Sequence, residues 1–234
     1  MCELTGTLSA FNCINDMVRK KIDSKASLRN AYMDFILKSG QRPKNIYSFV
    51  QEFKIPESEF YDHYGSFKAI EKSVFQAFFE NTISLLNENK DYHSFDAANK
   101  LLSFYFTFFE ILKANRSYVV CALEENKNLL FALSTLSEMK KSFHDFIQEL
   151  DIETPNFPEE KLQKFKDKAL VEGAWGQFIF TLKFWLDDSS KGFEKTDVFI
   201  EKSITTSFAL LDNSTLNSVF DLGKFLFKEK LMSN

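Results

Sequence analysis

Hydrophobic residues recur along most of the chain at intervals of three and four positions, which is the spacing of one face of an α-helix. In SLRNAYMDFILKSG this spacing places Leu28, Tyr32 and Phe35 on one stripe, and it predicts a helix capped by Ser27 and stopped at Gly40. No stretch shows the strict alternation that is typical of a half-buried strand. The pattern therefore predicts an all-α protein.

The predicted elements divide into a region of short helices and a region of longer ones. NIYSFVQEF predicts a second helix capped by Asn45, and Pro56 stands at the expected first position of a third, where its missing N–H costs nothing. We predict an N-terminal extension over residues 1–24, a compact three-helix unit over 25–75 and a larger helical unit over 76–234. The longer helical stretches are predicted at Phe67–Glu88, 94–118, 126–150, about Glu159–Leu186, Glu194–Leu211 and about Thr215–Lys230.

The composition fits a helical protein without a strong general attraction to nucleic acid. There are 28 Phe against 7 Gly and 4 Pro, which favours few turns and a bulky interior. The net charge of −4 gives no global basic field, so any contact with DNA or anionic lipid must be local. The longest apolar run, Ala174 to Leu186, is shorter than the roughly 20 residues of a membrane-spanning helix, so no transmembrane segment is predicted.

The residues that usually carry chemistry are sparse and scattered. The 3 cysteines are odd in number and lack metal-ligand spacing, which indicates a reducing compartment and a cytoplasmic protein. His63, His93 and His144 form no metal-binding array, and no Gly-rich phosphate loop is present. The sequence therefore predicts no metal, no cofactor and no enzymatic activity.

The segment from about Leu28 to Phe75 resembles the N-terminal domain of TetR-type transcriptional regulators. The matching stretches are AYMDFILKSG, NIYSFVQEFKI and EFYDHYGSFKAIEKSVF, in which Phe60, Tyr61 and Tyr64 occupy the family's Leu-Tyr-x-x-Phe positions. The resemblance implies a homodimer in which a bound ligand moves the helix Phe67–Glu88 and so changes the spacing of two DNA-recognition helices. It implies a helix-turn-helix that contacts operator DNA through Lys44, Asn45, Ser58, Glu59, Tyr61 and Lys68.

The recognition helix departs from this family pattern in its charge. Glu57 and Glu59 stand near its start, where the family usually has a small residue followed by Lys or Arg, and Asp62 adds a third acid. Lys and Arg supply much of DNA affinity by displacing counterions, so carboxylates oppose binding, although one can read cytosine N4. Two interpretations stay open: a regulator that tolerates its acids, and a folded scaffold that does not bind DNA. The phosphate-contact candidates are Arg42, Lys44, Lys54 and Lys68, of which Lys54 stands where the turn often has Gly.

A second resemblance lies in FTLKFWLDDSSKGFEKTDVFIEKSI, residues 180–204. It is similar to the C-terminal domain of the COQ9 family of ubiquinone-biosynthesis accessory proteins, in which a W-x-L-x-D-x-S pattern precedes a Thr and an aromatic-rich helix. This resemblance implies a lipid-binding protein with the TetR fold that does not bind DNA. The residues alone also predict a helix ending at DDSS, a turn at Gly192 and a capping or reinforcing role for Thr196.

Aromatic residues on two of the predicted long helices raise the question of a ligand. Helices that are apolar around most of their girth lie inside a bundle, where small-molecule pockets commonly form, although the same rings can simply fill a core. The segment 215–231 is amphipathic, and it can pack on its own domain or contact a membrane surface. The candidate residues for an apolar small-molecule or lipid ligand are Phe104, Phe108, Trp175, Phe178, Leu182 and Trp185.

Overall fold

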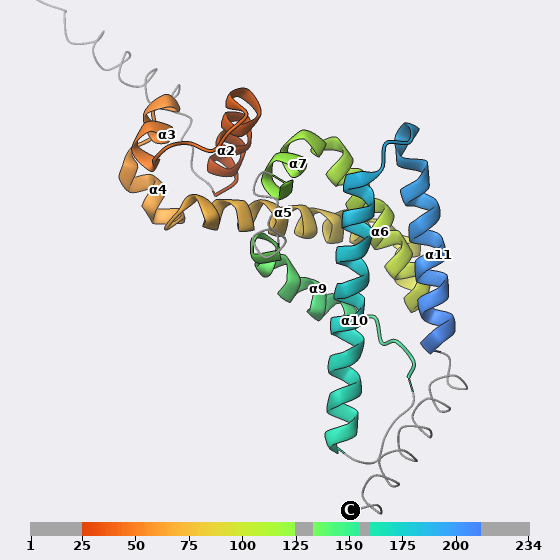
Figure 1. The fold of residues 1–234 in the computed structure, drawn as a ribbon. Coiled ribbons are helices and arrows are strands. Elements are labelled where there is room, and N and C mark those ends of the chain that lie inside the picture. The colour runs from red at the N-terminus through yellow and green to blue at the C-terminus, as the bar shows by residue number, and fades with distance from the viewer. Residues whose placement is uncertain (1–24, 125–132, 155–159, 212–234) are drawn as a thin grey trace, which may run out of the picture. The chain divides into compact units, whose positions relative to one another are not determined.

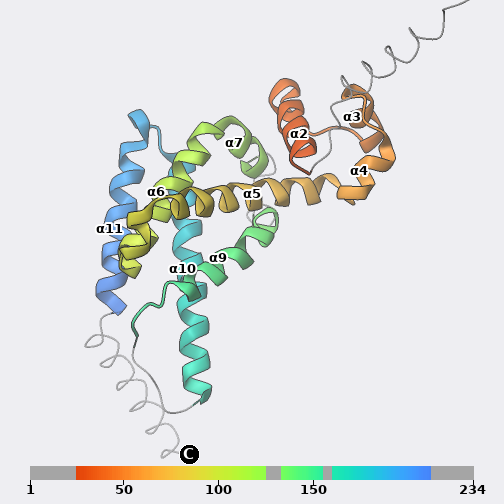
Figure 2. The same ribbon diagram turned by 180° about the vertical axis from the view of Figure 1, so that it is seen from behind.

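The computed structural model describes residues 25–124, 133–154 and 160–211, and the described chain is all-α, as predicted, with no strand (Figures 1 and 2). Two short 3₁₀ helices, η1 (Lys90–Ser94) and η2 (Lys191–Phe193), lie between longer elements. The α-helices are α2 (Lys25–Ser39), α3 (Ile46–Glu52), α4 (Glu57–His63), α5 (Phe67–Glu88), α6 (Ala97–Ala114), α7 (Arg116–Glu124), α9 (Ser137–Glu149), α10 (Glu160–Asp187) and α11 (Glu194–Leu211).

The described residues form two compact units. The first contains 25–74 together with 117–124 and 133–135, and the second contains 75–116, 136–154 and 160–211. Helix α5 begins in the first unit and ends in the second. The predicted N-terminal extension and the amphipathic segment 215–231 lie outside the described residues. None of the described helices is both long enough and apolar enough to span a membrane.

The first unit is built around the buried ring of Phe49 on α3. Its edge-on neighbours are Tyr32 of α2, Phe60 of α4 and Phe67 of α5, with ring centroids 6.0, 6.3 and 5.7 Å away. Aromatic pairs in this geometry add to the stability gained from burial alone. The Phe49 ring on α3 therefore contacts α2, α4 and the start of α5, and it holds these helices together.

The turns of the first unit follow the sequence signals closely. Asn45 caps α3 by accepting a hydrogen bond from the Ser48 N–H at 2.8 Å, and Gly40 takes φ +67° just after α2. Two details differ from the prediction: Ser27 lies inside α2, which already begins at Lys25, and Pro56 is the residue before α4 rather than its first residue. Proline's fixed φ suits both positions, so sequence alone does not separate them.

A buried polar cluster links α2, the segment after it and α5 inside the first unit. The Tyr32 hydroxyl donates to the Glu71 carboxylate at 2.6 Å, and the Arg42 guanidinium pairs with the same carboxylate. Glu71 is only 1% exposed, so it needs these partners. Burial and the neighbouring carboxylate raise the pKa of Tyr32, which keeps its phenol protonated as the donor.

In the second unit, α11 packs against α6 and α10, and α10 packs against α9. Arg116 connects the ends of these helices, because its guanidinium donates to the carbonyls of Trp185 and Leu186 at 3.1 and 3.0 Å. It also lies over the rings of Trp185 and Phe193, 4.4 and 4.5 Å from their centroids. A cation at the C-terminal end of a helix interacts favourably with the helix dipole, so Arg116 fixes the end of α10.

Candidate functional site

The surface formed by α3 and α4 is held in place by the buried face of α4. Phe60 and Tyr64 are buried, and the Tyr64 hydroxyl donates to the Lys25 carbonyl at 3.1 Å. On the outer face, Ser58 is exposed and the Tyr61 side chain is 53% exposed, with its ring edge-on to Phe60. The helix therefore presents one polar and aromatic face while the other is anchored.

The structure brings most of the expected DNA-contact residues to the surface of the first unit. Lys44 and Asn45 are exposed just before α3, and Lys68 is exposed in the first turn of α5. Glu59 is half-buried, and the Asn45 side chain is already occupied as the cap of α3. Five of the six expected residues, Lys44, Asn45, Ser58, Tyr61 and Lys68, are thus exposed.

The charge on this surface is mixed, and one expected cation is engaged elsewhere. Glu57 and Asp62 are exposed on α4, as is Lys54 in the turn before it. Arg42 is paired with the buried Glu71 instead of facing outward. This pairing could not be predicted from local sequence, since the two residues are separated by 29 positions.

In the second unit, most of the predicted ligand residues lie in one packed aromatic cluster. Phe104 and Phe108 of α6 stack at 5.6 Å, Phe108 meets Phe178 of α10 at 5.4 Å, and Phe178 stacks on Trp175 at 5.3 Å. Phe143 of α9, which the sequence analysis did not single out, contacts Phe104, Trp175 and Phe178. Leu182 and Trp185 are buried further along α10. These aromatic rings pack directly against one another in the space between α6, α9 and α10.

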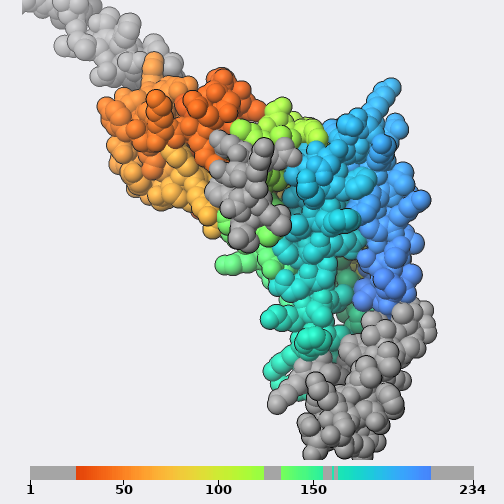
Figure 3. Space-filling view, in the orientation of Figure 1, coloured from red at the N-terminus to blue at the C-terminus, as the bar shows by residue number. Residues whose placement is uncertain are grey.

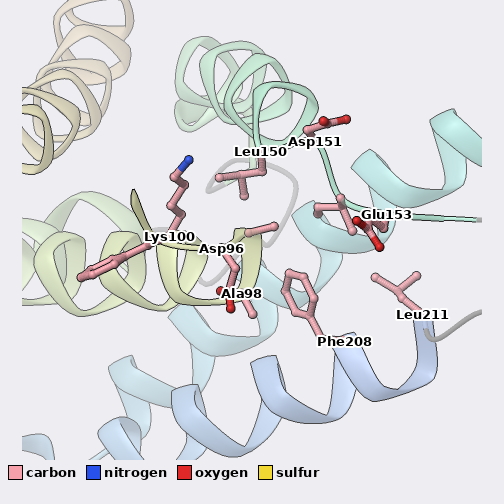
Figure 4. Close-up of a pocket in the computed structure, with 11 residues that line it drawn as sticks. Asp96, Ala98, Lys100, Leu150, Asp151, Glu153, Phe208 and Leu211 are labelled. Atoms are coloured by element: carbon pink, nitrogen blue, oxygen red, sulfur yellow. The ribbon is translucent and has the colours of Figure 1, made fainter. Parts of the chain in front are cut away.

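Two cavities in this unit are lined by residues outside the aromatic cluster. They lie near the start of α6 and the end of α11. The larger, about 550 Å³, lies between the start of α6, the segment after α9 and the end of α11, and Lys100, Asp151, Glu153 and Phe208 line it (Figure 4). The smaller, about 300 Å³, is bordered by α6, α10 and α11. Ile152, Phe208 and Leu211 line both cavities, so the two adjoin.

No group of three or more His, Cys, Asp or Glu side chains among the described residues could hold a metal ion. A family model described as "Tetracyclin repressor-like, C-terminal domain" matches residues 100–226, which is more than half of the chain. The chain belongs to the TetR family. A search of curated proteins found no match.

The TetR family match covers the aromatic cluster, the smaller cavity and the part of the larger cavity's lining that follows residue 99. It supports a TetR-type regulator over an enzyme. The COQ9 resemblance is not supported by either comparison. Its residues are explained by local structure: α10 ends at Asp187, Gly192 takes φ +66°, and Asp188 accepts hydrogen bonds from Ser190 and Thr196.

Proposed function

We propose that this TetR-family protein is a homodimeric, ligand-responsive regulator that binds operator DNA through α4. The observation that carries the proposal is the arrangement of α3 and α4. A capped first helix and a tight turn precede a short helix that is anchored by Phe60 and Tyr64 and leaves Ser58 and Tyr61 exposed. Helices of this kind enter the major groove while neighbouring groups contact phosphate.

The proposed contacts follow from exposure and chemistry. Ser58 stands in the first turn of α4, where recognition helices contact base edges, and the Tyr61 hydroxyl can donate to a phosphate oxygen. Lys44 and Lys68 supply the positive charge on the proposed surface. Glu59 is half-buried, so in this proposal it supports α4 more than it reads bases.

The proposed dimer uses α10 and α11, which lie side by side on the surface of the second unit (Figure 3). Phe180 of α10 and Val198 of α11 are 62% and 50% exposed. Covering apolar side chains of this size is favourable, and a two-fold dimer buries the same patch of both subunits. In the proposed mechanism, a ligand in the second unit shifts α5, which continues into the first unit.

Binding of the purified protein to the DNA upstream of its own gene, against unrelated DNA of equal length, tests the proposed function. We expect sequence-selective binding that weakens steeply with salt. Lys44→Ala should weaken binding to all sequences and reduce the slope of log affinity against log salt by about one. Lys141→Ala, an exposed lysine on α9, is the matched control and should have no effect. Absence of binding even at low salt would refute the proposal.

A lipid-binding protein that does not bind DNA is the second candidate, because one specific observation favours it. The outer face of α4 carries Glu57 and Asp62, and Arg42 is withdrawn into its pair with Glu71. In that case α3 and α4 serve only as a folding unit. The same DNA-binding experiment separates the two candidates, and extraction of bound lipid from the purified protein would support the second.

A further inference from the structure

The two adjoining cavities of the second unit have different chemical character. The smaller is lined mainly by apolar and small side chains, among them Leu101, Leu170 and Ala174, and its polar groups are Gln177 and Ser207. The larger has the charged residues Asp96, Lys100, Asp151 and Glu153 along its wall. A molecule that occupies both therefore needs an apolar body and a polar head. Together the cavities are of the size that holds small ligands in proteins.

The balance of charge in the larger cavity is negative. Its lining contains three acids and one lysine. One of the acids, Asp96, caps α6, because its carboxylate accepts a hydrogen bond from the Asn99 N–H at 2.8 Å. Asp151 and Glu153 form no ion pair or hydrogen bond through their side chains within the described part of the chain. They remain available to a ligand.

The positions of these groups suit a ligand with its head at one end. In Figure 4 the Glu153 carboxylate lies on the side of the view toward Leu211, the Asp151 carboxylate lies at the upper edge of the view, and the Lys100 ammonium lies on the side opposite Glu153. Phe208 extends from α11 at the lower side of the view and lines both cavities. The ring and the carboxylates line the same cavity, and this combination favours a cation, because carboxylates and the face of an aromatic ring both attract positive charge.

We propose that these cavities bind a cationic amphiphile, a molecule with a substituted ammonium or similar head on an apolar chain or ring system. The head lies near Asp151 and Glu153, and the body enters the apolar cavity between α6, α10 and α11. This inference rests on the proposed function, since it names the class of ligand to which the regulator responds. It locates that ligand beside the aromatic cluster rather than within it.

The test uses the full chain and titration calorimetry with decyltrimethylammonium below its micelle concentration. Decanoate, which has a similar chain and the opposite charge, is the comparison ligand. We expect decyltrimethylammonium to bind at least about ten times more tightly, because the carboxylates attract one head and repel the other. Equal binding of the two, or tighter binding of decanoate, would overturn the proposal.

Two variants separate the roles of charge and apolar surface. Asp151→Asn/Glu153→Gln should weaken binding of the cation by about three- to tenfold, as expected for two partly solvated charge pairs, without weakening decanoate. The matched control is Glu138→Gln/Asp145→Asn, two exposed acids of α9 outside the lining, which should change neither affinity. Phe208→Ala should weaken binding of both molecules. Circular dichroism of each variant shows whether it is folded.

The outcomes also distinguish this inference from the proposed function. Binding of the cation that depends on Asp151 and Glu153 supports the inference even if the protein does not bind DNA. Selective DNA binding with no affinity for the cation refutes the inference and leaves the regulator. Binding that appears only after removal of residues 212–234 would assign the cavities to the chain's own C-terminal segment and would also overturn the inference.

Discussion

The Asp188 carboxylate accepts two hydrogen bonds from Thr196, one from its backbone N–H at 3.0 Å and one from its hydroxyl at 2.7 Å. A third comes from the Ser190 N–H at 2.8 Å. One buried side chain thus ties the end of α10 to the first turn of α11 across the turn at Gly192. This contact holds together the two helices that we propose for the dimer interface.

Replacing this carboxylate should destabilise the second unit measurably. Asp188→Asn exchanges an ionised acceptor of three hydrogen bonds for a neutral amide, and we expect the free energy of unfolding to fall by about 1–2 kcal/mol. Urea denaturation at pH 7 measures this. The neighbouring Asp187→Asn is the control, because Asp187 is exposed and pairs at the surface with Lys183 at 2.8 Å. Equal losses in the two variants would contradict the role given to Asp188.

The same carboxylate makes a pH-dependent contribution to stability. Burial would raise the pKa of Asp188, but the hydrogen bonds from Ser190 and Thr196 outweigh burial and lower the pKa to about 2, from an ordinary value of 3.8. As the pH falls, the unfolded chain takes up the proton first, so this contribution is complete above about pH 4 and is lost as the pH falls toward 2. The difference in stability between the wild-type protein and Asp188→Asn should therefore shrink over that range. A constant difference down to pH 2.5 would contradict the lowered pKa.

Lys54 occupies a backbone conformation that favours glycine, with φ +55° in the turn between α3 and α4. A side chain with a Cβ is strained there, so Lys54→Gly should raise the free energy of unfolding of the first unit by up to about 1 kcal/mol. Gln51 is an exposed residue near the end of α3, and Gln51→Gly should instead lower the free energy of unfolding by about 1 kcal/mol. Chemical denaturation of both variants checks the opposite signs, and a loss of stability in both would show that the turn is not strained.

Arg116 should not be replaceable by lysine. A lysine ammonium can neither donate to the Trp185 and Leu186 carbonyls in the same planar geometry nor cover the rings of Trp185 and Phe193 with a flat guanidinium. We expect Arg116→Lys to lower the free energy of unfolding by about 1–3 kcal/mol, measured by denaturation followed through tryptophan fluorescence. Arg29→Lys on α2, a half-buried arginine of the first unit, is the matched control. If both changes were neutral, Arg116 would not fix the end of α10.

The sequence predicted local features well because helix periods and caps are encoded within a few residues. The bounds of α5, the start of α11 and the cap at Asn45 are confirmed, and α10 ends within one residue of the prediction. The pairs Arg42–Glu71 and Arg116–Trp185 could not be predicted, since they join residues 29 and 69 positions apart. Periodicity identified the aromatic faces of α6 and α10, but it could not show whether those rings line a cavity or fill it. The structure has them packed on one another, so their part in ligand binding stays a prediction.

The proposed dimer can be tested at one exposed ring. Phe180→Asp places a charge in the proposed interface of α10 and α11, and burying an unpaired charge is costly, so we expect the dimer dissociation constant to rise about 30-fold or more. Light scattering over a range of protein concentrations measures it. Leu37→Asp, on the exposed surface of α2, introduces the same charge elsewhere and should leave the dimer intact. A dimer unaffected by Phe180→Asp would place the interface on another surface.

The acids of α4 affect the balance between attraction and repulsion at the proposed DNA surface. Glu57 and Asp62 are both exposed, so if α4 enters the major groove they lie near phosphates and oppose binding. Glu57→Gln/Asp62→Asn should therefore tighten binding to unrelated DNA by roughly three- to tenfold at low salt, with a smaller gain at high salt because screening weakens the repulsion that is removed. Glu80→Gln/Glu88→Gln, which neutralises two exposed acids of α5 in the second unit, is the control and should have little effect.

If the α4 variant loses preference for the upstream DNA while it gains general affinity, one of the two acids reads a base, as a carboxylate can at cytosine N4. If neither affinity nor preference changes, α4 does not approach DNA and the regulator proposal fails at its central contact.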